Sequence, residues 1–159
     1  MSSSTQITQQ FREVYLNGKW VVATNFQEQI ADISWEQATT KVSTLNTIAA
    51  LVFHLNYYVE GVLKVLEGGP LTIRDKFSFD LPPIESQADW ERLRNKAIDN
   101  AEKFAAALEK LSDEDLAAPF VDEKYGTLER NIHVMIEHGY YHLGQIVLIK
   151  KMLLSKGEK

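Results

Sequence analysis

Two of the four histidines in the sequence stand four residues apart, as His138 and His142. On an α-helix, side chains at this spacing lie on one face, with their Cβ atoms roughly 5–6 Å apart. Two imidazole rings placed in this way can both reach one metal ion at about 2.0–2.1 Å. The H-x-x-x-H pair is therefore a candidate half of a metal site, although such a pair can also lie on a helix surface without a ligand.

His54 offers a third imidazole from a distant part of the chain. It follows the apolar run Leu51-Val52-Phe53, so we expect its ring to point into the interior. If its helix packs antiparallel to the helix of the pair, at the usual separation of about 8–10 Å, the three rings meet at one level. A single inward histidine can be an ordinary core residue with its nitrogens hydrogen-bonded. Three converging rings in apolar surroundings need a cation as their common partner.

We predict that His54, His138 and His142 bind one divalent transition metal ion. Imidazole suits both zinc and nickel, so the ligand set does not choose between these two metals. Three neutral ligands leave the charge of the ion uncompensated and a fourth position open, which is typical of catalytic rather than structural sites. An ion held in this way lowers the pKa of a bound water molecule to about 7.

Three further side chains are candidates to act beside the metal. Gln145 shares the helical face of the histidine pair and is placed to hydrogen-bond a ligand ring or a metal-bound water. Its alternative role is to satisfy a helix backbone group. Tyr58 and Tyr141 are candidates to bring hydroxyl groups to the site, with packing in the core as their alternative.

Four other residues near these motifs receive weaker predictions. Gly139 is expected to leave room for substrate beside the metal, and it stands where the H-E-x-x-H motif of zinc proteases would place the catalytic base. Glu137 is therefore interpreted as a solvated or interhelical charge. The spacing of His133 turns it away from the metal-facing side. Trp20 is expected either to line the mouth of a pocket or to anchor packing.

The apolar periodicity predicts an all-α protein with four substantial helices. The first is interrupted near Trp20, and a four-helix bundle is the economical way to bury the apolar faces. The expected helical ranges are about 5–16 with 24–31, then 43–67, 86–111 and 127–155.

Capping residues and one long loop mark the boundaries between these helices. Ser34 heads an S-x-x-Q capping box, Ser86 and Thr127 stand before the last two long helices, and residues 112–115 can start one short turn. Residues 70–85 form the longest irregular stretch, and loops of this length in compact domains often cover a site.

The composition narrows the class of protein. The 159 residues suit a single domain over 1–159, with ends at about 1–5 and 156–159 that we expect to be flexible. A net charge of −5 argues against nucleic acid as a partner. The lack of cysteine excludes thiolate metal sites and cysteine nucleophiles. The N-terminal residues lack the pattern of a signal peptide and apolar runs such as 48–53 are too short to span a bilayer, so we expect a cytoplasmic protein without membrane contact.

With these residues in view, the chain resembles the DinB-like family. His142-Leu143-Gly144-Gln145, preceded by His138, is similar to the family signature H-x-x-x-H-[RL]-G-Q. Residues 47–54, Thr-Ile-Ala-Ala-Leu-Val-Phe-His, resemble the segment of the second helix in which a histidine follows an apolar run. The likeness spans nearly the whole chain. Leu143 stands where many relatives have arginine.

The resemblance implies a bundle of up-down-down-up topology, often dimeric, in which His54, His138 and His142 match the three metal-ligand positions. Some relatives are transferases or isomerases that use bacillithiol, mycothiol or glutathione, and others are described only as candidate metal-dependent hydrolases. We therefore expect a thiol-dependent S-transferase that acts on small electrophilic molecules with a low-molecular-weight thiol. The alternatives are a metal-dependent hydrolase and a non-catalytic, stress-related bundle that binds metal or a partner.

The last helix carries more apolar residues than one buried stripe requires. Leucine, isoleucine, valine and methionine occupy nearly every side of residues 143–154, whereas a bundle helix normally needs one apolar face. The excess predicts a second buried surface, and we expect a homodimer.

Overall fold

The computed structural model describes residues 2–155, and within this range it is all-helical. An isolated bridge between Pro119 and Thr127 is its closest approach to a strand in the described residues. The elements are α1 Ser3–Tyr15, α2 Phe26–Ile30, α3 Trp35–Thr39, α4 Ile48–Leu66, the 3-10 helix η1 Asp75–Phe77, α5 Gln87–Leu108, α6 Asp113–Ala117, the 3-10 helix η2 Glu123–Tyr125, and α7 Leu128–Ser155.

The structure describes only part of the two ends that were predicted to be flexible. Helix α1 already begins at Ser3, inside the segment 1–5. The prediction for 156–159 lies outside the described residues.

Side-chain caps fix where most helices begin, as the sequence predicted. The Ser34 hydroxyl accepts a hydrogen bond from the Gln37 amide, and the Gln37 side chain accepts one from the Ser34 amide, which completes the capping box of α3. The Ser86 hydroxyl accepts from the Asp89 amide at the start of α5, and Thr127 Oγ1 accepts from the Arg130 amide at the start of α7. Each cap satisfies an N–H group that has no partner inside its helix.

The start of α4 differs from the prediction of about residue 43. Ser43 has a φ of 52°, in the left-handed region, so the chain cannot already be helical there. Thr47 is the actual N-cap, and its hydroxyl accepts from the Ala50 amide at 3.1 Å. Residues 43–47 therefore form a loop rather than the first turn of the helix.

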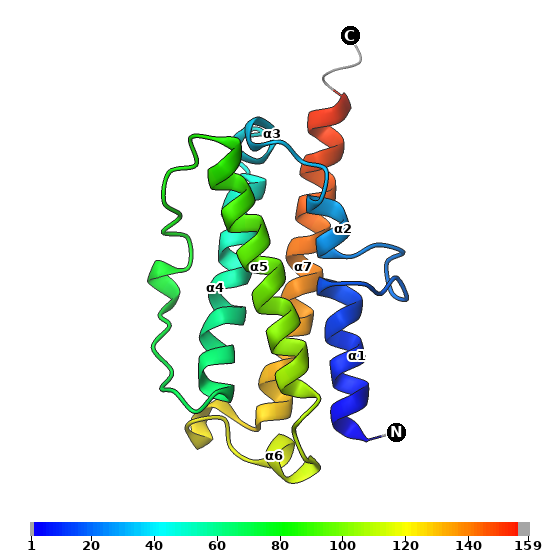
Figure 1. Cartoon of the computed structure of the whole chain (residues 1–159), viewed down its shortest axis with the longest axis vertical. Helices are drawn as coiled ribbons and strands as arrows, with labels where there is room; N and C mark the ends of the chain where they lie inside the picture. The colour runs from blue at the N-terminus through cyan, green and yellow to red at the C-terminus, as the bar shows by residue number, and fades with distance from the viewer. Residues whose placement is uncertain (1, 156–159) are drawn as a thin grey trace.

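Four long helices lie side by side (Figure 1). Helix α4 packs against α5 and α7, and α1 packs against the same two helices from the other side. In the view of Figure 1, α1 and α7 run upward, whereas α4 and α5 run downward. Because α4 and α5 share one direction, the chain between them must return along the whole length of α4, and residues 67–86, which contain η1, do so at the left of the figure.

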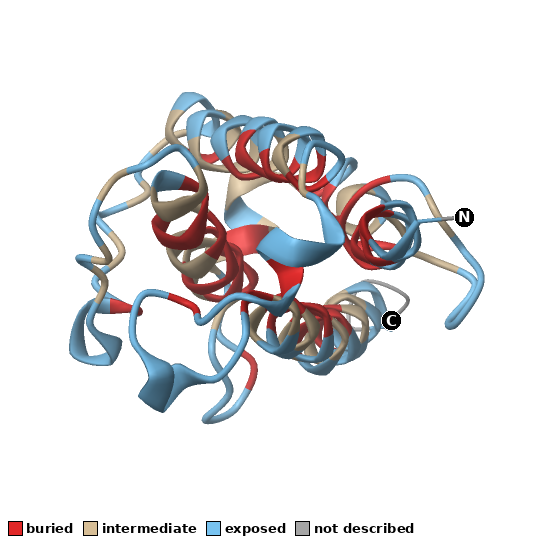
Figure 2. Cartoon of the chain, turned by 90° about the horizontal axis from the view of Figure 1, so that it is seen from below, coloured by how far each residue is buried: buried red, intermediate tan, exposed pale blue. Residues whose placement is uncertain are grey.

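The core lies between the helices, whose buried faces turn toward one another (Figure 2). Aromatic rings fill the space between α1 and α5: Phe11 stacks on Tyr15 with ring centroids 4.5 Å apart and meets Phe104 at 4.7 Å. Trp90 is fully buried, and its indole N–H donates to the Ile33 carbonyl at 2.8 Å. Each large side chain buried in this way contributes about 1.5–3 kcal/mol to the free energy of unfolding.

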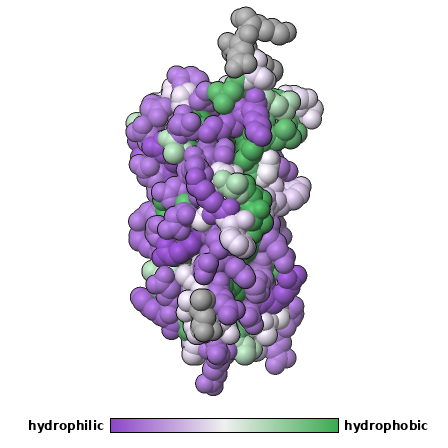
Figure 3. Space-filling model, turned by 90° about the vertical axis from the view of Figure 1, so that its right-hand side faces the viewer, coloured by the Kyte–Doolittle hydropathy of each residue, from purple (hydrophilic) through white to green (hydrophobic). Residues whose placement is uncertain are grey.

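The loop between α1 and α2 contradicts the prediction for Trp20. The Trp20 side chain is 87% exposed, so it neither anchors packing nor lines a pocket. Val21 and Val22 beside it are also exposed. Figure 3 shows the side of the molecule that bears this loop, with apolar side chains at the surface of its upper half.

Helix α4 is the one described helix that is long and apolar enough to cross a membrane by length and composition. The apolar run 48–53 alone is too short, but an 18-residue window of the 19-residue helix has a mean hydropathy of 1.2. Within the fold, 61% of this window is buried against other helices, as in the core helix of a compact domain. The finding is therefore weak support for a membrane span.

Candidate metal centre

Helices α4 and α7 bring the three predicted histidines together. The Nε2 atom of His138 lies 3.0 Å from Nε2 of His54 and 2.9 Å from Nε2 of His142. The three candidate ligand atoms all lie within 4.8 Å of one another. The two segments, which are more than eighty residues apart in sequence, thus offer three nitrogens to one point.

The outer nitrogens of two rings have partners that fix their orientation. Nδ1 of His54 lies 3.2 Å from the Ser78 carbonyl, and Nδ1 of His142 lies 2.7 Å from Oε1 of Gln145. Because both partners are oxygen acceptors, each Nδ1 carries the proton, and each Nε2 keeps its lone pair. Backbone or side-chain acceptors behind a ligand ring are the usual support of a histidine metal site.

Two Nε2 lone pairs therefore point at the Nε2 atom of His138. One N–H group on His138 cannot satisfy two acceptors that approach from different directions, and its own lone pair would repel at least one of them. A divalent cation attracts all three lone pairs at once, and nitrogen is a ligand that zinc and nickel accept. The donor set thus fits a metal ion, as in a metal-binding protein.

Burial keeps the three rings neutral. The side chains of His54 and His142 are 7% and 6% exposed, and His138 is half-buried. Burial lowers the pKa of His138 to about 4, assisted by repulsion from the other two rings. The pKa values of His54 and His142 are also lowered, first by burial. At neutral pH all three rings are uncharged, which is the form that binds a metal.

The segment 67–86 covers the centre, as predicted for the long loop. Phe79 stacks on His54 with ring centroids 4.0 Å apart and an angle of 11° between the planes. The segment is held on α4 by the Tyr58 hydroxyl, which donates to Asp75 Oδ1 at 2.9 Å. The Tyr57 hydroxyl accepts from the Arg74 amide at 2.8 Å and donates to the Arg74 carbonyl at 3.0 Å.

Ser78, Phe79 and Asp75 are the residues of this centre that sequence reasoning missed. In the sequence, only their position in a long loop pointed to them. No sequence motif predicts a contact made by a backbone carbonyl or by a stacked ring.

A mostly apolar cavity of about 290 Å³ opens beside His138. Val62 from α4 and Val134 and Met135 from α7 form its apolar wall, and Tyr58 and Asn131 add polar edges. A space of this size lies close to the lower limit of small-molecule sites. A ligand in it would contact one of the three candidate metal ligands directly.

The structure changes the predictions for Gly139 and Tyr141. Gly139 does not make room for substrate: a Cβ atom there would lie 2.8–3.0 Å from ring atoms of Tyr15, so the glycine makes room for this buried ring. Tyr15 in turn donates to the Met135 carbonyl at 3.1 Å, which ties α1 to α7. Tyr141 is 65% exposed and packs its ring edge-on against His142, with centroids 4.9 Å apart, from the solvent side.

Two other residues lie outside the trio. Glu137 is exposed and forms an ion pair with Arg130 at 3.3 Å, consistent with a solvated charge. His133 is half-buried and is not part of the cluster of metal-ligand atoms in the described residues.

Comparison with known proteins adds one match. A family model described as the DinB superfamily matches residues 21–146, which is most of the chain and includes all three histidines. No curated protein and no solved structure gives a significant match.

Proposed function

Because the chain belongs to the DinB superfamily and directs three neutral imidazoles at one point, we propose that it is a metal-dependent enzyme acting on a small molecule. The observation that carries this proposal is the convergence of three Nε2 atoms beside an apolar cavity. A purely structural metal site would be closed by a fourth protein ligand, and the described histidine, aspartate and glutamate residues bring only three ligand atoms to this point.

Within this class we favour thiol S-transfer. The metal would supply Lewis-acid chemistry that stabilises a thiolate at neutral pH. The chain has no cysteine, so the thiol comes from a low-molecular-weight cosubstrate. Its sulfur forms a bond to an electrophilic carbon while the bond from that carbon to the leaving group breaks, and the thiol proton passes to solvent. Zinc and nickel are both proposed, since the ligands suit either metal.

The residues of the chain would position this reaction. The Ser78 carbonyl and Gln145 hold the His54 and His142 rings in place, and Phe79 excludes water from one side of His54. The cavity wall of Val62, Val134 and Met135 suits an apolar electrophile beside His138. A metal-dependent hydrolase is the second candidate, because the same neutral ligand set also favours ionisation of a water molecule.

A fluorogenic electrophile distinguishes these possibilities. Protein loaded with zinc or nickel should convert monochlorobimane only in the presence of a thiol such as bacillithiol or glutathione. Turnover of ester or amide substrates that needs metal but no thiol would instead support the hydrolase. Elemental analysis of protein purified without metal-affinity steps, for wild type and His54→Ala, tests the site itself. Metal retained unchanged in the variant would remove His54 from it.

A non-catalytic bundle is the remaining candidate. It predicts that replacing all three histidines with alanine changes the melting temperature while no thiol-dependent or hydrolytic turnover is found in the wild type.

We further propose that the four long helices form the up-down-down-up bundle of the family and that two copies associate through α7. The parallel course of α4 and α5 supports the topology. Exposed apolar residues at spacings of seven and four support association along one side of α7: Val134, Tyr141, Leu148 and Met152. A strictly monomeric mass in light scattering would contradict the dimer.

A further inference from the structure

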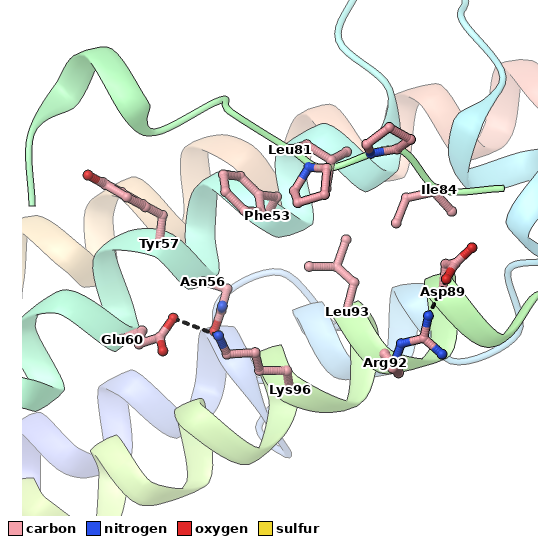
Figure 4. Close-up of a pocket in the computed structure, with 12 residues that line it drawn as sticks. Phe53, Asn56, Tyr57, Glu60, Leu81, Ile84, Asp89, Arg92, Leu93 and Lys96 are labelled. Carbon is pink, nitrogen blue, oxygen red and sulfur yellow. Dashed lines mark hydrogen bonds and ion pairs between the residues drawn. The ribbon is translucent and has the colours of Figure 1, made fainter. Parts of the chain in front are cut away.

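A second cavity lies between α4 and α5, whereas the metal centre lies between α4 and α7. It has a volume of about 330 Å³, within the range of small-molecule sites, and none of the three histidines lines it. Figure 4 shows its three walls: α4, α5, and the stretch from Leu81 to Ile84 that passes over both helices. Nothing in the proposed reaction uses this space.

The floor of the cavity holds a buried amide with unused hydrogen-bonding capacity. Asn56 is 5% exposed, and its Oδ1 accepts from Nδ2 of Asn100 at 2.8 Å. Among the hydrogen bonds of the described residues, none uses the Asn56 Nδ2 group. Asn56 Nδ2 is not fully enclosed either, so its N–H groups face the cavity. A bound carbonyl oxygen would replace water as the partner of this donor, in largely apolar surroundings where a hydrogen bond is stronger than in water.

The remaining walls are apolar. Phe53 from α4, Leu93 from α5, and Leu81 and Ile84 from the crossing segment face the same space (Figure 4). The prolines at 82 and 83 have no amide hydrogen to offer a ligand and keep this wall extended. These surfaces suit an aliphatic or aromatic body rather than a polar one.

Charges stand only at the two ends of the cavity and are paired within the protein. Lys96 Nζ lies 3.0 Å from Glu60 Oε2 at one end, and Arg92 pairs with Asp89 at the other (Figure 4). An anionic ligand would therefore meet a carboxylate beside each cation, and a cationic ligand would meet a cation beside each carboxylate. Because each charge is already paired, the cavity favours a ligand without net charge.

We infer that this cavity binds a small neutral molecule with an apolar body and one carbonyl acceptor, which receives a hydrogen bond from Asn56. The bond to the Asn56 amide orients the carbonyl toward the floor, and the body lies between Leu93 and the crossing segment. The inference is independent of the proposed metal-dependent reaction, because metal-free protein should bind the molecule equally well.

Titration of ¹⁵N-labelled, metal-free protein with 3-phenylpropanamide tests the site by nuclear magnetic resonance. We expect saturable shifts of the Asn56 side-chain amide and of backbone amides around Phe53 and Leu93. The carboxylate of the same shape, 3-phenylpropanoate, should bind several-fold more weakly. No saturable shift at the solubility limit of the amide, shifts that map elsewhere, or tighter binding of the carboxylate would each overturn the inference.

Two variants locate the ligand. Leu93→Trp fills the cavity from α5 and should abolish the shifts, whereas Leu45→Trp, on an exposed loop, should leave them unchanged. Asn56→Leu/Asn100→Leu removes both amides together and so leaves no unpaired partner. This double variant should bind 3-phenylpropanamide roughly fivefold more weakly, the value of one neutral hydrogen bond. Undiminished binding in Leu93→Trp would place the ligand outside the cavity.

Discussion

Two sides of helix α4 bury polar side chains in opposite ways. On the side toward α5, Asn56 and Asn100 present an acceptor and a donor to each other at 2.8 Å. On the side toward α7, His54, His138 and His142 present like nitrogens to a common point, 2.9 and 3.0 Å apart. The first arrangement is complementary within the protein, and the second is not.

The difference separates two polar side chains that pair with each other from three that need a metal ion to join them. Complementary buried groups stabilise the folded state modestly without a metal ion. Converging lone pairs on rings whose outer nitrogens are already bonded gain stability only when a cation joins them. Substitutions on the α7 side of α4 should therefore change metal binding. Substitutions on the α5 side should change the stability of the fold.

His138→Ala should have the largest effect, on metal affinity. It removes the nitrogen that lies closest to the other two ligand atoms. We therefore expect the metal affinity to fall by more than about 100-fold, which exceeds the loss expected when a residue that only supports a ligand is replaced. Competition with a chelator, followed by elemental analysis, measures the change. Asn100→Ala is the matched control and should keep its metal. An equal loss of metal affinity in Asn100→Ala would contradict the proposed difference between the two sides of α4.

Asn56→Ala should act on stability instead. It leaves the buried Asn100 without its acceptor, and we expect a loss of about 1–3 kcal/mol in the free energy of unfolding. Urea denaturation measures this loss. The double variant Asn56→Leu/Asn100→Leu should recover most of it, because neither amide is then left unpaired. A double variant less stable than Asn56→Ala would show that the amide pair does more than satisfy itself.

Gln145→Ala tests the support behind the metal ligands. Loss of the acceptor at His142 Nδ1 should weaken metal binding by about 10- to 100-fold, with little change in the stability of the metal-free protein. Gln145→Glu keeps an acceptor at that position and should retain most of the affinity. Isothermal titration of metal into both variants gives the comparison. Equal affinity of Gln145→Ala and wild type would leave Gln145 without a role at the centre.

The last prediction concerns the pH dependence of stability. The pKa of His138 is lowered to about 4 in the folded protein, so the unfolded chain binds a proton on this residue that the folded protein does not. Stability of the metal-free protein is therefore full above about pH 6.5 and declines as pH falls toward 4. Thermal melts between pH 7.5 and 4.5 should show a shallower decline in His138→Gln. Parallel curves would contradict this assignment.

Local signals in the sequence predicted much of the fold. Ser34, Ser86 and Thr127 marked helix starts correctly because a capping hydroxyl acts within three residues. The start of α4 was placed too early, since nothing in the residue type of Ser43 reveals its left-handed backbone. The trio of histidines was predictable because helical spacing and an apolar context place each ring on an inward face.

Features that depend on a partner from another element escaped prediction. Gly139 faces Tyr15, and Trp20 faces solvent, and neither fact follows from neighbours in sequence. The cavity over Asn56 needs three separate segments to close it.

The shared direction of α4 and α5 has a consequence for how such a protein could diversify. A chain that must travel from the end of α4 to the start of α5 passes the level of His54, where Ser78 contacts its ring. Segment 67–86 thus shields the histidines from solvent because it has to connect α4 to α5. Segment 67–86 is tied to α4 by a few hydrogen bonds. Substitutions and length changes in it would reshape the cavity over Asn56 and the cover of His54 while leaving the packed core unchanged.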